Sequence, residues 1–214
     1  SSTYSCIDLN NFSGKLDFKK FWDIKDLKDK YSTLNFKNAI SVFQNLLEDA
    51  IKIRLRSDVP LVTMLSGGLD SSVISYLASN NFKNTSTFSI ISENKNYSEE
   101  NFIDSLNQKF NFHSTKIIFD PSQMENYLEK TINCQQEPFA GFSIVAQNLL
   151  FNKISNTNFK VVLSGQGGDE VLLGYLKYYF YSMKFAFKKY NFSRFFNLIV
   201  GAIVNRKWFS KRAI

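Results

Sequence analysis

The chain has 214 residues, of which 44% are hydrophobic and 21% are charged, and it contains two cysteines. This composition predicts one well-cored globular domain with room for an appendage, and the two isolated cysteines indicate no disulfide framework. The formal net charge of +7 is uneven, at +2 over residues 1–60, −4 over 61–170 and +9 over 171–214, so the basic excess lies near the C-terminus.

The N-terminal third of the chain predicts a connector followed by a helix. Residues 1–35 are polar, with scattered aromatic residues, whereas apolar residues recur at steps of three and four from Phe36 to Arg56, which is typical of an amphipathic helix. The sequence shows no secretory signal pattern, and the longest apolar run, "FFNLIVGAIV", is about half as long as a spanning helix requires. We therefore expect a cytoplasmic protein without a membrane segment.

Short apolar runs then alternate with helical patterns. The runs lie at 61–65, 86–91, 115–119 and 160–164, and the helical patterns at about 71–80, 98–110, 121–135 and 143–155. This alternation predicts an α/β fold with a doubly wound, mostly parallel sheet, followed by a helical C-terminal tail. If the first run is central, with the second and third on one side and the fourth on the other, the loops after 61–65 and 160–164 face each other.

Each of these two loops is rich in glycine and carries an aspartate. "LSGGLDSS" spans 65–72 and "LSGQGGDE" spans 163–170. Gly67 and Gly68 let backbone N–H groups approach phosphate oxygens, and a helix starting near Ser71 directs its positive end at an anion. Asp70 and Asp169 would repel bare phosphate, so the pattern predicts Mg²⁺ between the carboxylates and a polyphosphate. The loop is no Walker P-loop, because no lysine follows the glycines.

The first loop matches the S-G-G-x-D-S signature and resembles the PP-loop ATP pyrophosphatases. The second continues as "LSGQGGDEVLLGY" and resembles a segment of the glutamine-dependent asparagine synthetases, with supporting matches in "FWD", "RSDVP", "TFSI" and "EPF". The resemblance implies an ATP-dependent synthetase that adenylates aspartate or a related acid, releases pyrophosphate and then aminates the adenylate with ammonia from glutamine.

The resemblance also implies roles for particular residues. Mg²⁺ would be held by Asp70 and Asp169. The β and γ phosphates of ATP would be held by Ser66, Gly67, Gly68, Asp70, Ser71 and Ser72, and the adenosine contacted by Leu65, Ile90, Ser164 and Gly165. Gln166 occupies the position of a catalytic glutamate in asparagine synthetases, and a neutral amide can orient a reactant but cannot act as a base.

The same resemblance divides the chain into three parts. Residues 1–35 would be the connector from a missing glutaminase domain, 36–180 the synthetase domain and 181–214 the start of a truncated helical region. The expected partners are a small carboxylate substrate and a glutaminase domain or subunit, with a homodimer left open. The basic, aromatic tail favours helix packing over nucleic-acid binding.

Two alternatives remain open. The first is a PP-loop relative that acts on a sugar acid, a lactam precursor or tRNA. The second is a truncated remnant that binds a nucleotide without catalysis.

Overall fold

The computed structural model describes residues 2–11, 14–82, 85–94 and 98–204. The chain forms two compact units, Ser1–Ile53 and Arg54–Ile214. The sequence places the start of the synthetase domain at residue 36, whereas the structure groups the helix that begins there with the N-terminal segment. The last ten residues of the predicted helical region lie outside the described part of the chain.

The first unit consists of a short hairpin and two helices. Strands β1 (Thr3–Tyr4) and β2 (Lys19–Lys20) pair antiparallel and are followed by α1 (Ile24–Tyr31). The Asp23 carboxylate caps α1 by accepting a 3.0 Å hydrogen bond from the Lys25 backbone N–H. Helix α2 (Phe36–Arg54) confirms the predicted amphipathic helix and continues to the first residue of the second unit.

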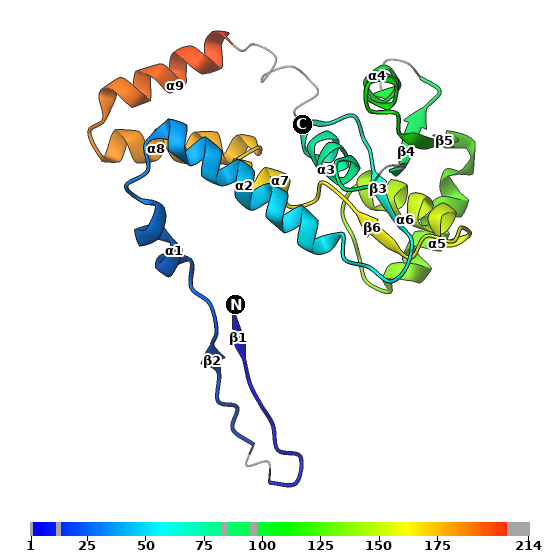
Figure 1. The fold of residues 1–214 in the computed structure, drawn as a ribbon, viewed down its shortest axis with the longest axis horizontal. Helices are drawn as coiled ribbons and strands as arrows, with labels where there is room; N and C mark the ends of the chain where they lie inside the picture. Colours follow the sequence, from blue (N-terminus) through cyan, green and yellow to red (C-terminus); the bar gives the residue numbers. More distant parts are fainter. Residues whose placement is uncertain (1, 12–13, 83–84, 95–97, 205–214) are drawn as a thin grey trace. The chain divides into compact units, whose positions relative to one another are not determined.

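The second unit is built on a parallel sheet (Figure 1). Its strands are β3 (Leu61–Met64), β4 (Ser86–Ser92), β5 (His113–Phe119) and β6 (Val161–Leu163), and their order is β5-β4-β3-β6. All three pairings are parallel. The structure therefore confirms the predicted order, in which the strand before the first glycine-rich loop neighbours the strand before the second.

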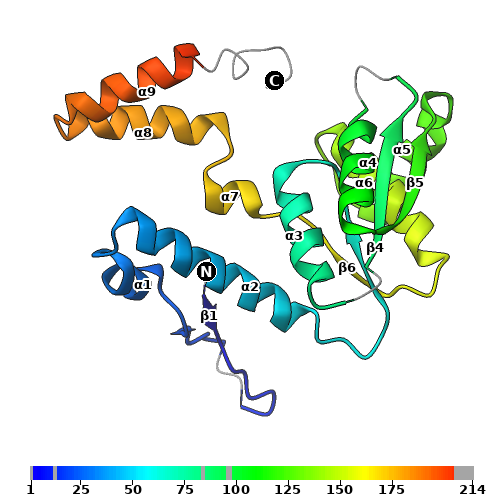
Figure 2. The same ribbon diagram turned by 45° about the horizontal axis from the view of Figure 1, so that its top comes forward.

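Helices cover both faces of this sheet (Figures 1 and 2). Side chains alternate along a strand, so neighbouring residues of β3 pack on opposite faces. Val62 packs with the α6 residues Leu149 and Leu150, whereas the hydroxyl of Thr63 accepts a 2.9 Å hydrogen bond from Ser75 of α3. One layer contains α3 (Leu69–Ser79) and α4 (Glu100–Phe110), and the other contains the single turn η1 (Pro121–Gln123), α5 (Met124–Gln135) and α6 (Phe142–Ser155).

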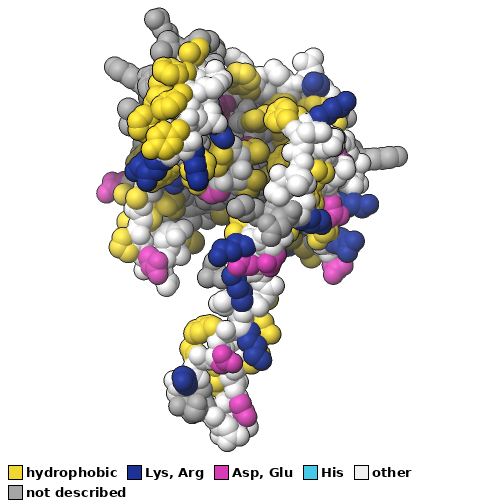
Figure 3. Space-filling view, turned by 90° about the vertical axis from the view of Figure 1, so that its left-hand side faces the viewer, with side chains coloured by type: hydrophobic (Ala, Val, Ile, Leu, Met, Phe, Trp, Pro, Cys, Tyr) yellow, Lys and Arg dark blue, Asp and Glu magenta, His cyan; other side chains and the backbone are white. Residues whose placement is uncertain are grey.

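Three helices follow β6 within residues 164–204, as the sequence predicts for a helical tail. They are α7 (Gly168–Leu172), α8 (Leu176–Lys188) and α9 (Phe192–Val204). Helices α8 and α9 lie side by side, and the Tyr179 hydroxyl donates to the Leu198 carbonyl. Figure 3 shows hydrophobic side chains at the surface, and those exposed on α8 include Phe180, Tyr181 and Phe185. In the described part of the chain, no helix has the length and apolar character that crossing a membrane requires.

Candidate functional site

The first glycine-rich loop turns the chain from β3 into α3. The Leu65 N–H still bonds the Phe88 carbonyl at 2.9 Å, as a strand residue would, and Gly67 then adopts a φ of +83° that favours glycine. Helix α3 begins at Leu69, two residues before the predicted start near Ser71. Its cap residue Gly68 makes no side-chain hydrogen bond to the first turn. The first-turn N–H groups of α3 can therefore be offered to an anion.

The serines of this loop hold its shape by hydrogen bonds to each other and to the backbone. Ser71 Oγ accepts from the Ser66 N–H at 3.1 Å and donates to the Gly68 carbonyl at 3.1 Å, and it lies 2.9 Å from Ser66 Oγ. Ser72 Oγ donates to the same Gly68 carbonyl at 2.6 Å. The loop is thus fixed before any ligand arrives, which lowers the entropic cost of binding.

The second glycine-rich loop lies directly against the first. A Cβ added at Gly165 would lie 2.8 Å from the Ser71 backbone nitrogen, and one added at Gly168 would lie 2.5 Å from the Asp70 carboxyl carbon. Both distances are shorter than any ordinary Cβ contact. The absence of side chains at these two glycines is what lets the loops after β3 and β6 meet.

The residues after α7 fold back onto its acidic first turn. The Gly174 N–H bonds the Asp169 carbonyl at 2.9 Å, and a Cβ at 174 would overlap the Asp169 carboxylate. The Tyr175 hydroxyl donates to Glu170 Oε1 at 2.8 Å. The glycine and tyrosine that end the second motif therefore hold the two carboxylates that begin α7.

The two loops border a cavity of about 670 Å³. One end carries the loop residues and the carboxylates of Asp70 and Asp169, and the other is formed by apolar residues of β3, β4 and α6. Ten of the predicted site residues line this cavity: Leu65, Ser66, Gly68, Asp70, Ser71, Ile90, Ser164, Gly165, Gln166 and Asp169. Gly67 and Ser72 are not among the lining residues, since Ser72 bonds the backbone and Gly67 packs against α4.

A comparison with known protein families identifies the family of the chain that carries these two loops. Residues 42–212 match the model of the asparagine synthase family. The chain belongs to the asparagine synthase family. It is 35% identical over 158 residues to the putative asparagine synthetase 2 of Methanocaldococcus jannaschii, covering 73% of this chain and 30% of that protein. It is 29% identical over 176 residues to asparagine synthetase 3 of Bacillus subtilis, covering 75% of this chain and 28% of that protein.

The chain spans less than a third of the length of these two curated relatives. Among solved structures, the NH3-dependent NAD synthetase of Campylobacter jejuni is similar, with a TM-score of 0.43 and 18% identity over 66% of this chain and 61% of that chain.

Negative charge gathers at the loop end of the cavity. Partial burial raises the pKa of the Asp70 carboxyl, and the nearby carboxylates of Asp169 and Glu170 raise it further. No lysine or arginine is among the described residues that line the cavity. The carboxylates at this end repel a polyphosphate, and a cation that offsets their charge would reduce that repulsion.

The residues present fit Mg²⁺ bound jointly with a phosphate. Within the described ranges no three histidine, cysteine or carboxylate side chains are grouped to hold an ion by themselves. Mg²⁺ is usually held by one or two carboxylates together with phosphate oxygens, and the mutual repulsion of Asp70 and Asp169 is what a shared cation would relieve. The donor set thus suits an ion that arrives with its nucleotide.

Four polar residues of the cavity were missed by the sequence reasoning: Ser89, Glu99, Ser143 and Gln147. Glu99 precedes the first residue of α4, and Gln147 lies on α6, and both line the cavity. Each stands in a segment whose pattern predicts an amphipathic helix and marks no polar residue as functional. The order of the strands, rather than any local motif, brings these two helices to the site.

Proposed function

We propose that this chain is the ATP-binding part of an amide-forming synthetase. It would adenylate a small carboxylate, aspartate or a related acid, release pyrophosphate and allow ammonia to convert the adenylate into an amide. The observation that carries the proposal is the contact of two glycine-rich, aspartate-bearing loops at the mouth of one cavity. Membership of the asparagine synthase family supports the reaction type.

The loop end of the cavity suits the β and γ phosphates. Ser66, Gly68 and Ser71 line it, and the first turn of α3 offers backbone N–H groups to an anion. Gly67 and Ser72 would support the loop indirectly. Gly67 shapes its turn, and Ser72 donates a hydrogen bond to the Gly68 carbonyl. Phosphate contacts from these two residues remain a prediction.

The other end suits adenosine. Ile90 is half-buried on β4 and can present apolar surface to a flat base, whereas Leu65, which directly follows β3 and is 1% exposed, would support that surface from beneath. Ser164 and Gly165 of the second loop line the same cavity, where their backbone groups can fix the ribose or the base edge. Ribose and base would then lie between β4 and the second loop.

Asp70 and Asp169 would hold Mg²⁺. When bound, the ion neutralises phosphate charge and so favours departure of pyrophosphate. The two carboxylates are kept in place by Gly168, which packs on Asp70, and by Gly174, which packs on Asp169. Their common orientation toward the cavity is the contribution of this chain to that chemistry.

The chemical step needs positioning more than acid–base catalysis. A carboxylate oxygen of the acid attacks the α-phosphorus of ATP, and the bond from that phosphorus to the bridging oxygen of the β phosphate breaks. Ammonia then attacks the acyl carbon, and AMP leaves. Gln166 lines the cavity and can hydrogen-bond the intermediate or the amine through its amide. Ammonia would come from a glutaminase domain or subunit, as the glutamine-hydrolyzing names of the relatives suggest.

Exchange of labelled pyrophosphate into ATP tests this proposal. The label should enter ATP only when an acid is present that the site adenylates, so a panel of aspartate, other amino acids and sugar acids identifies the substrate class. Asp169→Asn should abolish exchange, whereas the matched variant Asp104→Asn should retain it, because Asp104 pairs with Lys116 on the surface. Absence of exchange with every acid, by a chain that binds ATP, would favour a non-catalytic nucleotide-binding module.

A further inference from the structure

Glu99 is a carboxylate at the phosphate end of the cavity that the proposed mechanism does not use. It lines the cavity, and its Cβ lies 3.2 Å from the position that a Cβ on Gly67 would occupy. Its backbone oxygen lies 3.4 Å from the same point. The start of α4 is therefore packed directly on the turn of the first glycine-rich loop.

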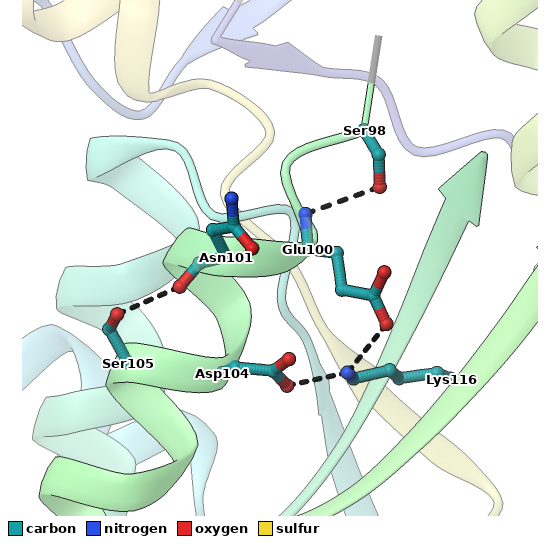
Figure 4. Close-up of polar contacts among 6 residues, drawn as sticks. All are labelled: Ser98, Glu100, Asn101, Asp104, Ser105 and Lys116. Atoms are coloured by element: carbon teal, nitrogen blue, oxygen red, sulfur yellow. Dashed lines mark hydrogen bonds and ion pairs between the residues drawn. The ribbon is translucent and has the colours of Figure 1, made fainter. Parts of the chain in front are cut away.

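The neighbouring carboxylates of α4 share an ion pair with Lys116, whereas Glu99 has none among the described residues. Figure 4 shows Lys116 of β5 between Glu100 and Asp104, at 2.8 Å and 2.5 Å from their carboxylate oxygens. Ser98 also accepts a hydrogen bond from the Glu100 N–H at 3.3 Å. These contacts fix the first turn of α4, and the described residues offer Glu99 no ion pair. Its charge thus faces the cavity from a rigid support.

The surroundings of Glu99 disfavour the charged form of its carboxyl. Partial burial raises the pKa of its carboxyl, although the residue keeps an exposed surface. The cavity already holds Asp70 and Asp169, and its described lining includes no basic side chain. A third negative charge beside a phosphate-binding loop weakens binding of a bare polyphosphate and matters less once a divalent cation covers the phosphates.

We infer that Glu99 selects the metal-complexed form of the nucleotide by repelling free ATP from the loop. The inference rests on the proposed function, because it assumes that the loop receives phosphates. A unit charge about 8 Å from a phosphate, at an effective dielectric constant of about 20–40, changes affinity roughly five- to thirtyfold. Glu99 is a specificity-determining residue in this account, not a catalytic one.

Titration calorimetry with ATP, in excess Mg²⁺ and in EDTA, tests the inference. For Glu99→Gln we expect ATP binding in EDTA to strengthen roughly tenfold and ATP binding in Mg²⁺ to change little. The ratio of the dissociation constant in EDTA to that in Mg²⁺ should therefore fall. Glu99→Asp, which keeps the charge, should restore the ratio. Glu100→Gln is the matched control: it removes a charge one residue away that is paired with Lys116, so its ratio should change much less than that of Glu99→Gln.

Each result of this experiment has a defined meaning. An unchanged ratio in Glu99→Gln, or an equal change in Glu100→Gln, would overturn the inference while leaving the proposed function intact. Loss of binding by Glu99→Gln in both solutions, by a folded variant, would also overturn it, because the Glu99 side chain would then be required for binding instead of opposing it. A folded wild-type chain that binds no ATP in Mg²⁺ would overturn both proposals.

Discussion

Gly168→Ala adds one methyl group where the two glycine-rich loops touch. The new Cβ would lie 2.5 Å from Cγ and from Oδ2 of Asp70, whereas ordinary van der Waals contact begins at 3.4 Å. The Asp70 carboxylate, which is the movable partner, must therefore shift by about 1 Å. A displacement of that size in a group that orients a metal ion lowers affinity roughly 10- to 100-fold.

The same substitution should hardly change stability. Gly168 is the first residue of α7 and has no positive φ, so alanine gains about 0.5–1 kcal/mol of helix preference to set against the crowding. Gly167→Ala should behave in the opposite way. Gly167 has a φ of +91° and nothing within 4 Å of an added Cβ, so alanine costs about 1 kcal/mol of stability and leaves Asp70 in place.

Calorimetry with ATP and Mg²⁺, beside thermal unfolding of each variant, separates the two effects. Gly168→Ala should lose nucleotide affinity at nearly unchanged stability, and Gly167→Ala should lose stability at nearly unchanged affinity. The reasoning fails if Gly168→Ala binds as tightly as the wild type, or if both variants lose affinity equally.

Two further predictions concern stability. Partial burial, and then the nearby charges of Asp169 and Glu170, raise the pKa of Asp70, so its charge destabilises the folded chain at neutral pH. Asp70→Asn should therefore raise the free energy of unfolding by up to about 1 kcal/mol at pH 7.5, a gain that disappears below the ordinary carboxyl pKa of 3.8. Asp104→Asn, which breaks a pair with Lys116, should show no such gain in the same denaturant titrations. Ser75→Ala leaves the fully buried Thr63 hydroxyl without its donor, which should cost about 1–3 kcal/mol, and adding Thr63→Val should recover part of that loss.

The sheet was predictable because its signals are local. Each strand is a short apolar run and each crossover a helical pattern, and the rules for parallel sheets then order the strands. The predicted strand before the second loop is five residues long, from 160 to 164, whereas β6 spans Val161–Leu163. The residues beyond β6 turn away into the loop that meets Asp70, a contact that no local pattern encodes.

The residues of the candidate site were predictable where they belong to a sequence motif. They were not predictable where only tertiary contacts bring them to the cavity. The glycines and aspartates of both loops stand out in the sequence, and most of them line the cavity. Glu99 belongs to no recognisable motif, because nothing near it in sequence distinguishes it from Glu100, which pairs with Lys116. The structure also groups α2 with the N-terminal unit, although its pattern alone gives no reason to separate it from the domain that follows.

The most direct test of the central claim is calorimetric titration of the purified chain with ATP and Mg²⁺, beside the double variant Asp70→Ala, Asp169→Ala. Thermal unfolding first establishes that both proteins are folded. If the two loops form one metal–nucleotide site, the wild type binds ATP when Mg²⁺ is present and the double variant does not. Equal binding by the two proteins, or no binding by a folded wild-type chain, would contradict the account.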